Sequence, residues 1–203
     1  METIGVSSNS LNPGKFESII FMRLFICLWM LCAASFLYGQ IGNEFPEMEA
    51  ESLTNQMVNI PADISGKYTL IGLAYSKKSE KDLKTWFNPT YNQFIHTAKQ
   101  PSLFGVSYDV HVYFVPMFTG AKRAAYKSVM KKVKQTIDPK LQPHVMFYKG
   151  DIKTYKKALN FQGKDVPYFF VLDKAGKVVM ATSGRYSDAK MQQVLDILDA
   201  ADL

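Results

Sequence analysis

The sequence predicts an α/β fold in which a mixed central sheet lies between layers of helices. Residues 68–75 form a near-continuous apolar run, the pattern of a central strand whose two faces are both covered. Helical patterns separate this run from two later strand patterns, which predicts parallel crossover connections. A hairpin pattern near the C-terminus adds an antiparallel edge to the sheet. These three observations indicate a three-layer domain.

The elements after the first strand follow from the spacing of apolar residues. A helical pattern covers residues 79–98 through Leu83, Trp86 and Phe87, and Pro89 must break or restart it. Residues 110–115 form a second strand pattern. Residues 120–137 predict a helix whose apolar residues recur at intervals of three or four: Tyr126, Val129, Met130, Val133 and Ile137.

The C-terminal half continues the alternation and ends in a hairpin and a helix. Residues 145–148 predict a third strand, and Asp151 caps the helix that follows. Residues 168–172 and 177–181 predict a hairpin around the turn at 173–176. Ser187 caps the last helix, which packs on the sheet through Met191, Val194, Leu195 and Leu198.

Length and composition allow one well-packed domain and a tail. The chain has 203 residues, of which 47% are hydrophobic and 21% charged, as in an ordinary globular protein. We divide it into an N-terminal extension with a signal peptide at 1–39, an extended lead-in at 40–65 that contains Pro46 and Pro61, and a folded domain at 66–203.

An apolar segment near the N-terminus predicts export. Residues 24–38 carry no charge and precede Gly39. A membrane-spanning helix needs about 20 apolar residues, whereas this run is closer in length to the apolar part of a secretory signal. We therefore expect cleavage near Gly39; the alternative is an uncleaved anchor that begins near Ile19. In both cases the chain is expected to be exported, periplasmic or membrane-associated.

Both cysteines, Cys27 and Cys32, lie inside this apolar segment. Cleavage near Gly39 would leave a mature chain without a thiol. Such a chain forms no disulfide and cannot carry out thiol exchange, because the thiolate is the reacting species. We therefore expect no thiol oxidoreductase activity.

The layout of the domain resembles the thioredoxin superfamily, especially its exported thiol-reductase and peroxiredoxin branches. Gly66-Lys67 introduces the first strand, and Val166-Pro167 opens the hairpin. The resemblance implies a thioredoxin-like fold and a cis peptide bond before Pro167, which faces the active-site loop in that superfamily. Those families place a reactive cysteine just after the first strand, where residues 76–81 here are Ser-Lys-Lys-Ser-Glu-Lys. The resemblance therefore implies the fold without its usual thiol chemistry.

This resemblance predicts a docking groove for an extended polypeptide or a membrane-protein partner. A gapless comparison places Lys78 and Lys81 where two cysteines would fall, and a shift of two residues places Ser76 and Ser79 there instead. Hydroxyls at a helix start are far more often caps than nucleophiles. We expect a binding role without catalytic residues, metal or cofactor. The predicted groove consists of Ser76, Lys77, Lys78, Ser79, Lys81, Trp86, Val166 and Pro167.

A narrower motif is similar to the mitochondrial ATP synthase assembly chaperone family, which is also thioredoxin-like without the paired cysteines. The tryptophan, proline and phenylalanine of that family map onto Trp86, Pro89 and Phe94. Its later strand and hairpin end are similar to residues 168–173 and 183–186. This resemblance implies an assembly role, with a subunit of a membrane complex as partner.

The alternative function is a thiol-independent enzyme or a metal carrier that uses a serine, lysine or histidine in the groove. Ser76 or Ser79 would need a positioned histidine, and the histidines lie in separate segments, at His96, His111 and His144. Copper would need soft ligands, and the candidates are His144, Met146, Met117 and Met180. For methionines, packing in the core is the more common role.

Charge gives a further, separate expectation. The chain has 24 basic and 18 acidic residues, a formal net charge of +6. One predicted helix could meet an anionic membrane surface or an acidic partner, although a solvated helix face is the commoner meaning of such a pattern. Nucleic acid is not expected as a partner, since no binding motif is present. The basic residues on this helix are Lys122, Arg123, Lys127, Lys131, Lys132 and Lys134.

Overall fold

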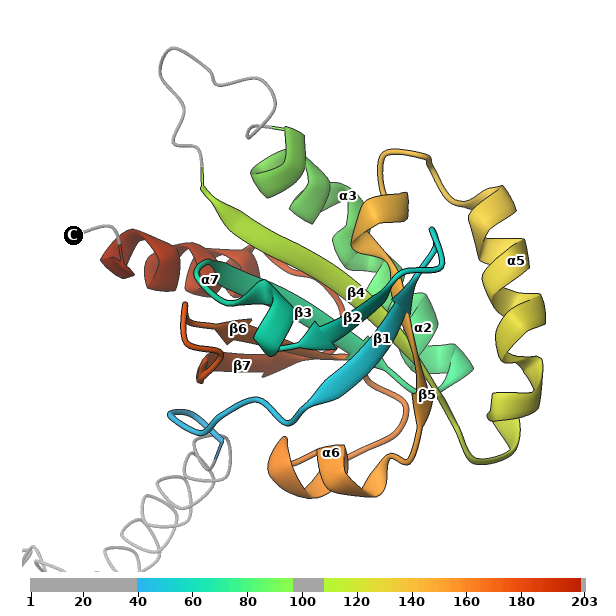
Figure 1. Cartoon of the computed structure of the whole chain (residues 1–203). Coiled ribbons are helices and arrows are strands. Elements are labelled where there is room, and N and C mark those ends of the chain that lie inside the picture. The colour runs from blue at the N-terminus through green and yellow to red at the C-terminus, as the bar shows by residue number, and fades with distance from the viewer. Residues whose placement is uncertain (1–39, 97–107, 202–203) are drawn as a thin grey trace, which may run out of the picture. The chain divides into compact units, whose positions relative to one another are not determined.

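Seven strands form one mixed sheet in the order β2-β1-β5-β4-β3-β6-β7 (Figure 1). This computed structural model describes residues 40–96 and 108–201. The three central strands β3, β4 and β5 are parallel, and the outer strands are antiparallel to their neighbours. The strands are β1 (Met48–Ser52), β2 (Met57–Ile60), β3 (Tyr68–Ala74), β4 (Val110–Thr119), β5 (Met146–Gly150), β6 (Tyr168–Leu172) and β7 (Val178–Ser183).

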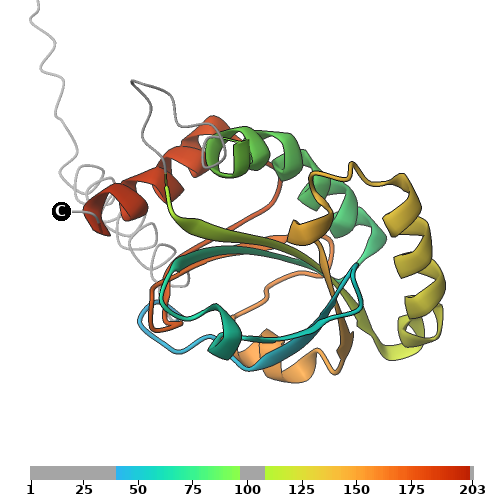
Figure 2. The ribbon, with the colours of Figure 1, turned by 45° about the horizontal axis from the view of Figure 1, so that its top comes forward.

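Helices cover both faces of this sheet, which confirms the predicted α/β fold with three layers (Figure 2). Side chains alternate along β3, so that Leu70 faces one core and Ile71 the other. The first core lies under α2 (Lys77–Leu83), α3 (Phe87–Thr90), α5 (Tyr126–Thr136) and α7 (Asp188–Ala201). The second lies under α6 (Lys153–Ala158) and the segment before β1.

Pro89 restarts the helix after β3, as predicted. A 3-10 turn, η3 (Lys84–Trp86), ends α2, and Pro89 is the third residue of α3. A proline is tolerated there because its missing N–H falls in the first turn. The helix then continues as a π-helical segment, η4 (Tyr91–His96), and residues 97–98 of the prediction lie outside the described part.

Several boundaries differ from the prediction by a few residues. A 3-10 turn, η5 (Gly120–Ala125), precedes α5, so the regular helix begins later than expected. Asp151 lies two residues before α6 and accepts the Lys153 N–H at 3.0 Å, which satisfies one of the free donors at the helix start. The hairpin of β6 and β7 turns at residues 173–176, as predicted.

The segment predicted to be an extended lead-in forms two strands. β1 pairs with β5, and β2 pairs with β1 at the edge of the sheet. In β1 the apolar Met48 and Ala50 are buried, while Glu49 between them is exposed. Alternation over only four or five residues is a weak signal in the sequence, and the prediction missed it.

The apolar segment at 24–38, with Cys27 and Cys32, lies outside the described residues. Within residues 40–96 and 108–201, no helix has both the length and the apolar character needed to cross a bilayer.

Candidate functional site

The carboxyl end of β3 gathers most of the predicted groove residues. β3 and β6 pair with Leu73 opposite Tyr168, so Val166 and Pro167 lie beside the chain as it leaves β3. Ser76 follows directly and begins α2. In open α/β sheets, ligands bind at the carboxyl ends of the strands. This end of the sheet is therefore the candidate site.

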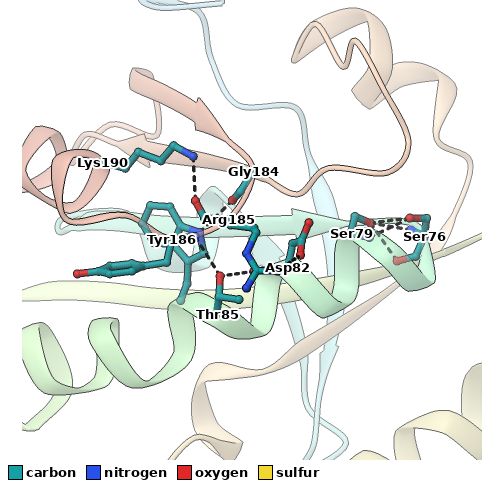
Figure 3. A network of polar contacts seen from close by, with 9 residues as sticks. Ser76, Ser79, Asp82, Thr85, Gly184, Arg185, Tyr186 and Lys190 are labelled. Atoms are coloured by element: carbon teal, nitrogen blue, oxygen red, sulfur yellow. Dashed lines mark hydrogen bonds and ion pairs between the residues drawn. The ribbon is translucent and has the colours of Figure 1, made fainter.

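Ser76 and Ser79 form a reciprocal capping box. Ser79 N–H donates to Ser76 Oγ at 3.0 Å, Ser76 N–H donates to Ser79 Oγ at 2.9 Å, and the two hydroxyl oxygens are 3.1 Å apart (Figure 3). Both are buried, and Ser79 is 0% exposed. The structure thus supports capping as the role of these hydroxyls, and it removes Ser79 from any exposed groove.

Neither serine bonds to a histidine in the described part of the chain. His144 Nδ1 lies 3.0 Å from the Val112 carbonyl oxygen. His111 pairs with Thr69, at the opposite end of β3 from Ser76. A nucleophilic serine needs a base within hydrogen-bond reach. Neither of these histidines bonds to Ser76 or Ser79.

Replacing Ser79 by alanine tests the capping role. The change removes the acceptor of the Ser76 N–H and leaves that donor buried, so the free energy of unfolding is expected to fall by about 1–2 kcal/mol. Chemical denaturation of Ser79→Ala and of Ser65→Ala, an exposed serine, measures the difference. A Ser79→Ala chain of unchanged stability would contradict the capping role.

Pro167 differs from the prediction in two ways. The Val166–Pro167 bond is trans, since the cis bond among the described residues is Ile60–Pro61. Pro167 is also buried. Its carbonyl accepts the Gly184 N–H at 2.8 Å, which continues the pairing of β6 with β7 by one residue.

Trp86 is also a core residue and not part of an exposed surface. It is 0% exposed, stacks on Phe169 with 4.0 Å between ring centroids, and meets the edge of Tyr186 at 5.4 Å. Its indole N–H donates to the Gly184 carbonyl at 3.1 Å. The predicted place of Trp86 in the groove is therefore wrong, because the ring fills the space between the helix and the hairpin.

Polar contacts from α2, η3 and α7 hold the chain after β7 (Figure 3). Thr85 Oγ1 accepts the Tyr186 N–H at 3.0 Å, and Arg185 pairs with Asp82 at 3.3 Å. Lys190 Nζ donates to the carbonyls of Ser183 and Arg185. Together with Trp86 these contacts form what we call the Trp86 clamp. Two of the sequence motifs that resemble the chaperone family, around Trp86 and at 183–186, thus contact each other in the Trp86 clamp.

An aromatic cluster that was not predicted lies at the end of the sheet beside Pro167. Phe161 stacks on Tyr75 and Tyr168, with centroids 5.6 and 4.2 Å apart. Tyr75 and Tyr168 both donate from their hydroxyls to the Gly163 carbonyl at 2.8 Å. Burial, then the charges of Tyr168 and Asp165, raises the pKa of Tyr75 to about 12. Tyr75 therefore stays protonated at neutral pH and fixes the loop before β6.

The exposed part of the predicted groove is basic with one apolar residue. Lys77, Lys78 and Lys81 are exposed on α2, and Val166 is 36% exposed. The two ion pairs of the described chain join other residues, Lys67 with Asp109 and Arg185 with Asp82. We call Lys77, Lys78, Lys81 and Val166 the docking surface.

The residues of the metal alternative do not come together. Met117 and Met146 are buried in the second core, whereas Met180 is buried in the first core on the other face of the sheet. These methionines pack the interior.

On α5, Lys127, Lys131 and Lys134 are exposed beside Glu51. A contact of these lysines with an anionic membrane stays a prediction.

Comparison with solved structures shows the same fold. The thiol:disulfide interchange protein DsbE of Chlorobium tepidum has a TM-score of 0.52 and 16% identity, over 78% of this chain and 97% of that one. The reduced 2-Cys peroxiredoxin of Plasmodium vivax has a TM-score of 0.51 and 16% identity, over 80% and 98%. The fold is thioredoxin-like. No curated protein sequence matches the chain closely enough to count as a relative.

The sequence profile described as ATP10 protein matches residues 34–199, which include every described strand and helix up to the last turn of α7. This match agrees with the chaperone resemblance of Trp86, Pro89 and Phe94. The chain belongs to the ATP10 protein family of ATP synthase assembly factors.

Proposed function

We propose that this protein is a thiol-independent assembly factor that binds a polypeptide partner, a subunit of an ATP synthase, at the docking surface. One observation carries the proposal: a buried serine pair caps the helix that follows the first central strand, while Lys77, Lys78 and Lys81 around it stay exposed. A scaffold of this kind keeps a binding site and lacks thiol exchange.

Membership of the ATP10 protein family supports a protein partner. The charge of the docking surface supports an acidic region on that partner, since Lys77, Lys78 and Lys81 make no ion pair within the described residues. The hydroxyls of Ser76 and Ser79 already bond to each other, so no contact favours the enzymatic alternative. The apolar segment at 24–38 supports action in an exported or membrane-associated compartment.

Reversing two charges on the docking surface tests the proposal. In cells without their own copy of the gene, the tagged full chain and the double variant Lys77→Glu, Lys78→Glu are crosslinked and purified from membrane and soluble export fractions. Recovery of an ATP synthase subunit is expected to fall about tenfold in the variant, because two attractive contacts become repulsive. Quantitative mass spectrometry of the purified material measures the change.

The matched control is Lys174→Glu, Lys177→Glu, which reverses the same number of charges on two exposed lysines at the opposite end of β6. This control should capture as much subunit as the unchanged chain. Equal recovery by all three proteins, or recovery of no ATP synthase subunit, would contradict the proposed function. Absence of the protein from export and membrane fractions would contradict its proposed location.

A further inference from the structure

A hollow of about 460 Å³ lies between α5 and the turn that joins β1 to β2, at the outer edge of the helical layer (Figures 1 and 2). The buried side chains of Leu53 and Met130 give it an apolar part. We call this space the α5 hollow. The other described residues that line it are polar or charged: Glu51 and Asn55 on one side, and Lys127, Lys131 and Lys134 on α5.

The three lysines lie on one face of α5 and have no acidic neighbour on that helix. Lys127, Lys131 and Lys134 follow one another at intervals of four and three residues, so their side chains lie next to each other. Residues 120–136 contain basic residues and no acidic one. Like charges at this spacing destabilise a helix, whereas glutamates there would stabilise it. None of the three lysines joins an ion pair within residues 40–96 and 108–201, so their charge is available to an anion from outside.

Glu51 is the one carboxylate among the described residues that line the α5 hollow, and Tyr126 binds it. The Tyr126 hydroxyl donates to Glu51 Oε2 at 2.7 Å. Burial, then this hydrogen bond, raises the pKa of Tyr126, so the hydroxyl keeps its proton at neutral pH. Lys149 of β5 is exposed and lies over the Tyr126 ring, with Nζ 5.7 Å from the ring centroid. The lysines in and beside the hollow therefore outnumber its carboxylate.

We propose that this face of α5 docks on an anionic membrane, with the phosphate of one lipid headgroup in the α5 hollow between Lys131 and Asn55. Lysines near a bilayer are attracted by its anionic lipids, and a row of like charges fits a surface that carries many charges of the opposite sign. The apolar segment at 24–38 ends just before Gln40, the first described residue, and its expected role in export or anchoring brings the chain to a bilayer. The proposal goes beyond the proposed function, because the ligand is a lipid and no polypeptide partner is needed.

Lysine footprinting of the full chain tests this surface directly. Acetic anhydride labels exposed lysines, and mass spectrometry measures the labelling rate of each one, with vesicles of phosphatidylcholine alone and with vesicles that also contain phosphatidylglycerol. The anionic vesicles are expected to slow the labelling of Lys127, Lys131 and Lys134 about fivefold, the factor that corresponds to one lysine held at an anionic surface. Lys153 and Lys157, which are exposed on α6 over the other face of the sheet, should keep their rates. Because the readout is local, binding of the segment at 24–38 to either kind of vesicle does not obscure it.

A triple variant measures what the row contributes to affinity. Lys127→Gln, Lys131→Gln, Lys134→Gln is expected to weaken binding to the anionic vesicles about a hundredfold, since each lysine near such a surface contributes roughly a factor of five. Glutamine forms helices about as well as lysine, so α5 should be retained. The matched control, Lys153→Gln, Lys157→Gln, Lys174→Gln, removes the same charge from exposed lysines away from α5 and should bind as tightly as the unchanged chain. Cosedimentation with vesicles measures both.

Asn55 tests the place of the headgroup. Asn55→Asp adds a negative charge inside the α5 hollow, whereas Gln56→Glu adds it on the next residue, which is exposed and does not line the hollow. The first change is expected to weaken binding to the anionic vesicles about fivefold and the second less. Equal losses would contradict a headgroup in the hollow.

Three outcomes would overturn the proposal as a whole. They are equal labelling of Lys127, Lys131 and Lys134 with both kinds of vesicle, equal loss of affinity in the two triple variants, and protection of the same lysines by inorganic phosphate or by a polyglutamate peptide but not by anionic vesicles. The last result would assign the face to a soluble anion or to an acidic protein. These assays need no ATP synthase subunit and leave Lys77 and Lys78 unchanged, so their outcome is independent of the capture experiment.

Discussion

Replacing Trp86 by alanine is expected to lower the free energy of unfolding by about 3–5 kcal/mol, the usual cost of removing a fully buried large aromatic side chain. The indole is 0% exposed and loses its stack on Phe169 and its edge contact with Tyr186. The Gly184 carbonyl loses its indole donor at the same time. Urea denaturation followed by circular dichroism measures the change.

Trp86→Phe separates the two parts of this effect. Phenylalanine keeps a ring against Phe169 but cannot donate to Gly184, so its cost is expected to be smaller, about 1–2 kcal/mol. If Trp86→Ala kept the stability of the unchanged chain and lost only the capture of a partner, Trp86 would act at a surface, and the Trp86 clamp would be the wrong interpretation.

Replacing Gly72 by alanine is expected to cost about 1–3 kcal/mol through overpacking. A Cβ at this position would lie 2.6 Å from Phe169 Cε1 and 2.9 Å from Leu83 Cδ1. Both neighbours belong to the first core, so either the ring or the end of α2 must shift. Because α2 carries Lys77 and Lys78, such a shift would also displace the docking surface. Thermal unfolding measures the loss of stability.

Gly163→Ala is the matched control, because a Cβ there meets no atom within 4 Å. We expect this variant to unfold within about 0.5 kcal/mol of the unchanged chain. Equal stability of the Gly72 and Gly163 variants would show that the sheet and α2 can relax around an added methyl group, contrary to the tight packing described for β3.

The sequence predicted the central strands because their apolar runs are long. Residues 68–75 and the strand at 168–172 are covered on both faces, and burial of that kind leaves a continuous pattern. β1 and β2 were missed because both are short. β1 has glutamates between its buried residues, and only Ile60 is buried in β2. The pairing of β1 with β5 depends on residues almost a hundred positions away, which local patterns do not record.

The candidate site was predicted only in part, for a related physical reason. Lys77, Lys78 and Val166 come together because the register of β3 and β6 places them at one end of the sheet. Trp86 was assigned to the groove because a sequence motif shows that a residue matters but not which way its ring points. The α5 hollow was not predicted, since it forms where α5 meets the turn between β1 and β2, two segments far apart in the sequence.

The paired serines at the start of α2 cannot undergo the redox reactions of a cysteine pair. Ser76 and Ser79 are three residues apart, the spacing of a redox-active cysteine pair, and their hydroxyls hold the helix start by hydrogen bonds alone. A hydroxyl is not oxidised to the sulfenic, sulfinic and sulfonic acids that a thiol forms, and it cannot be trapped in a mixed disulfide. These hydroxyls therefore behave alike in a reducing and an oxidising compartment. Under the proposed function, release of a partner would not use electron transfer at this serine pair.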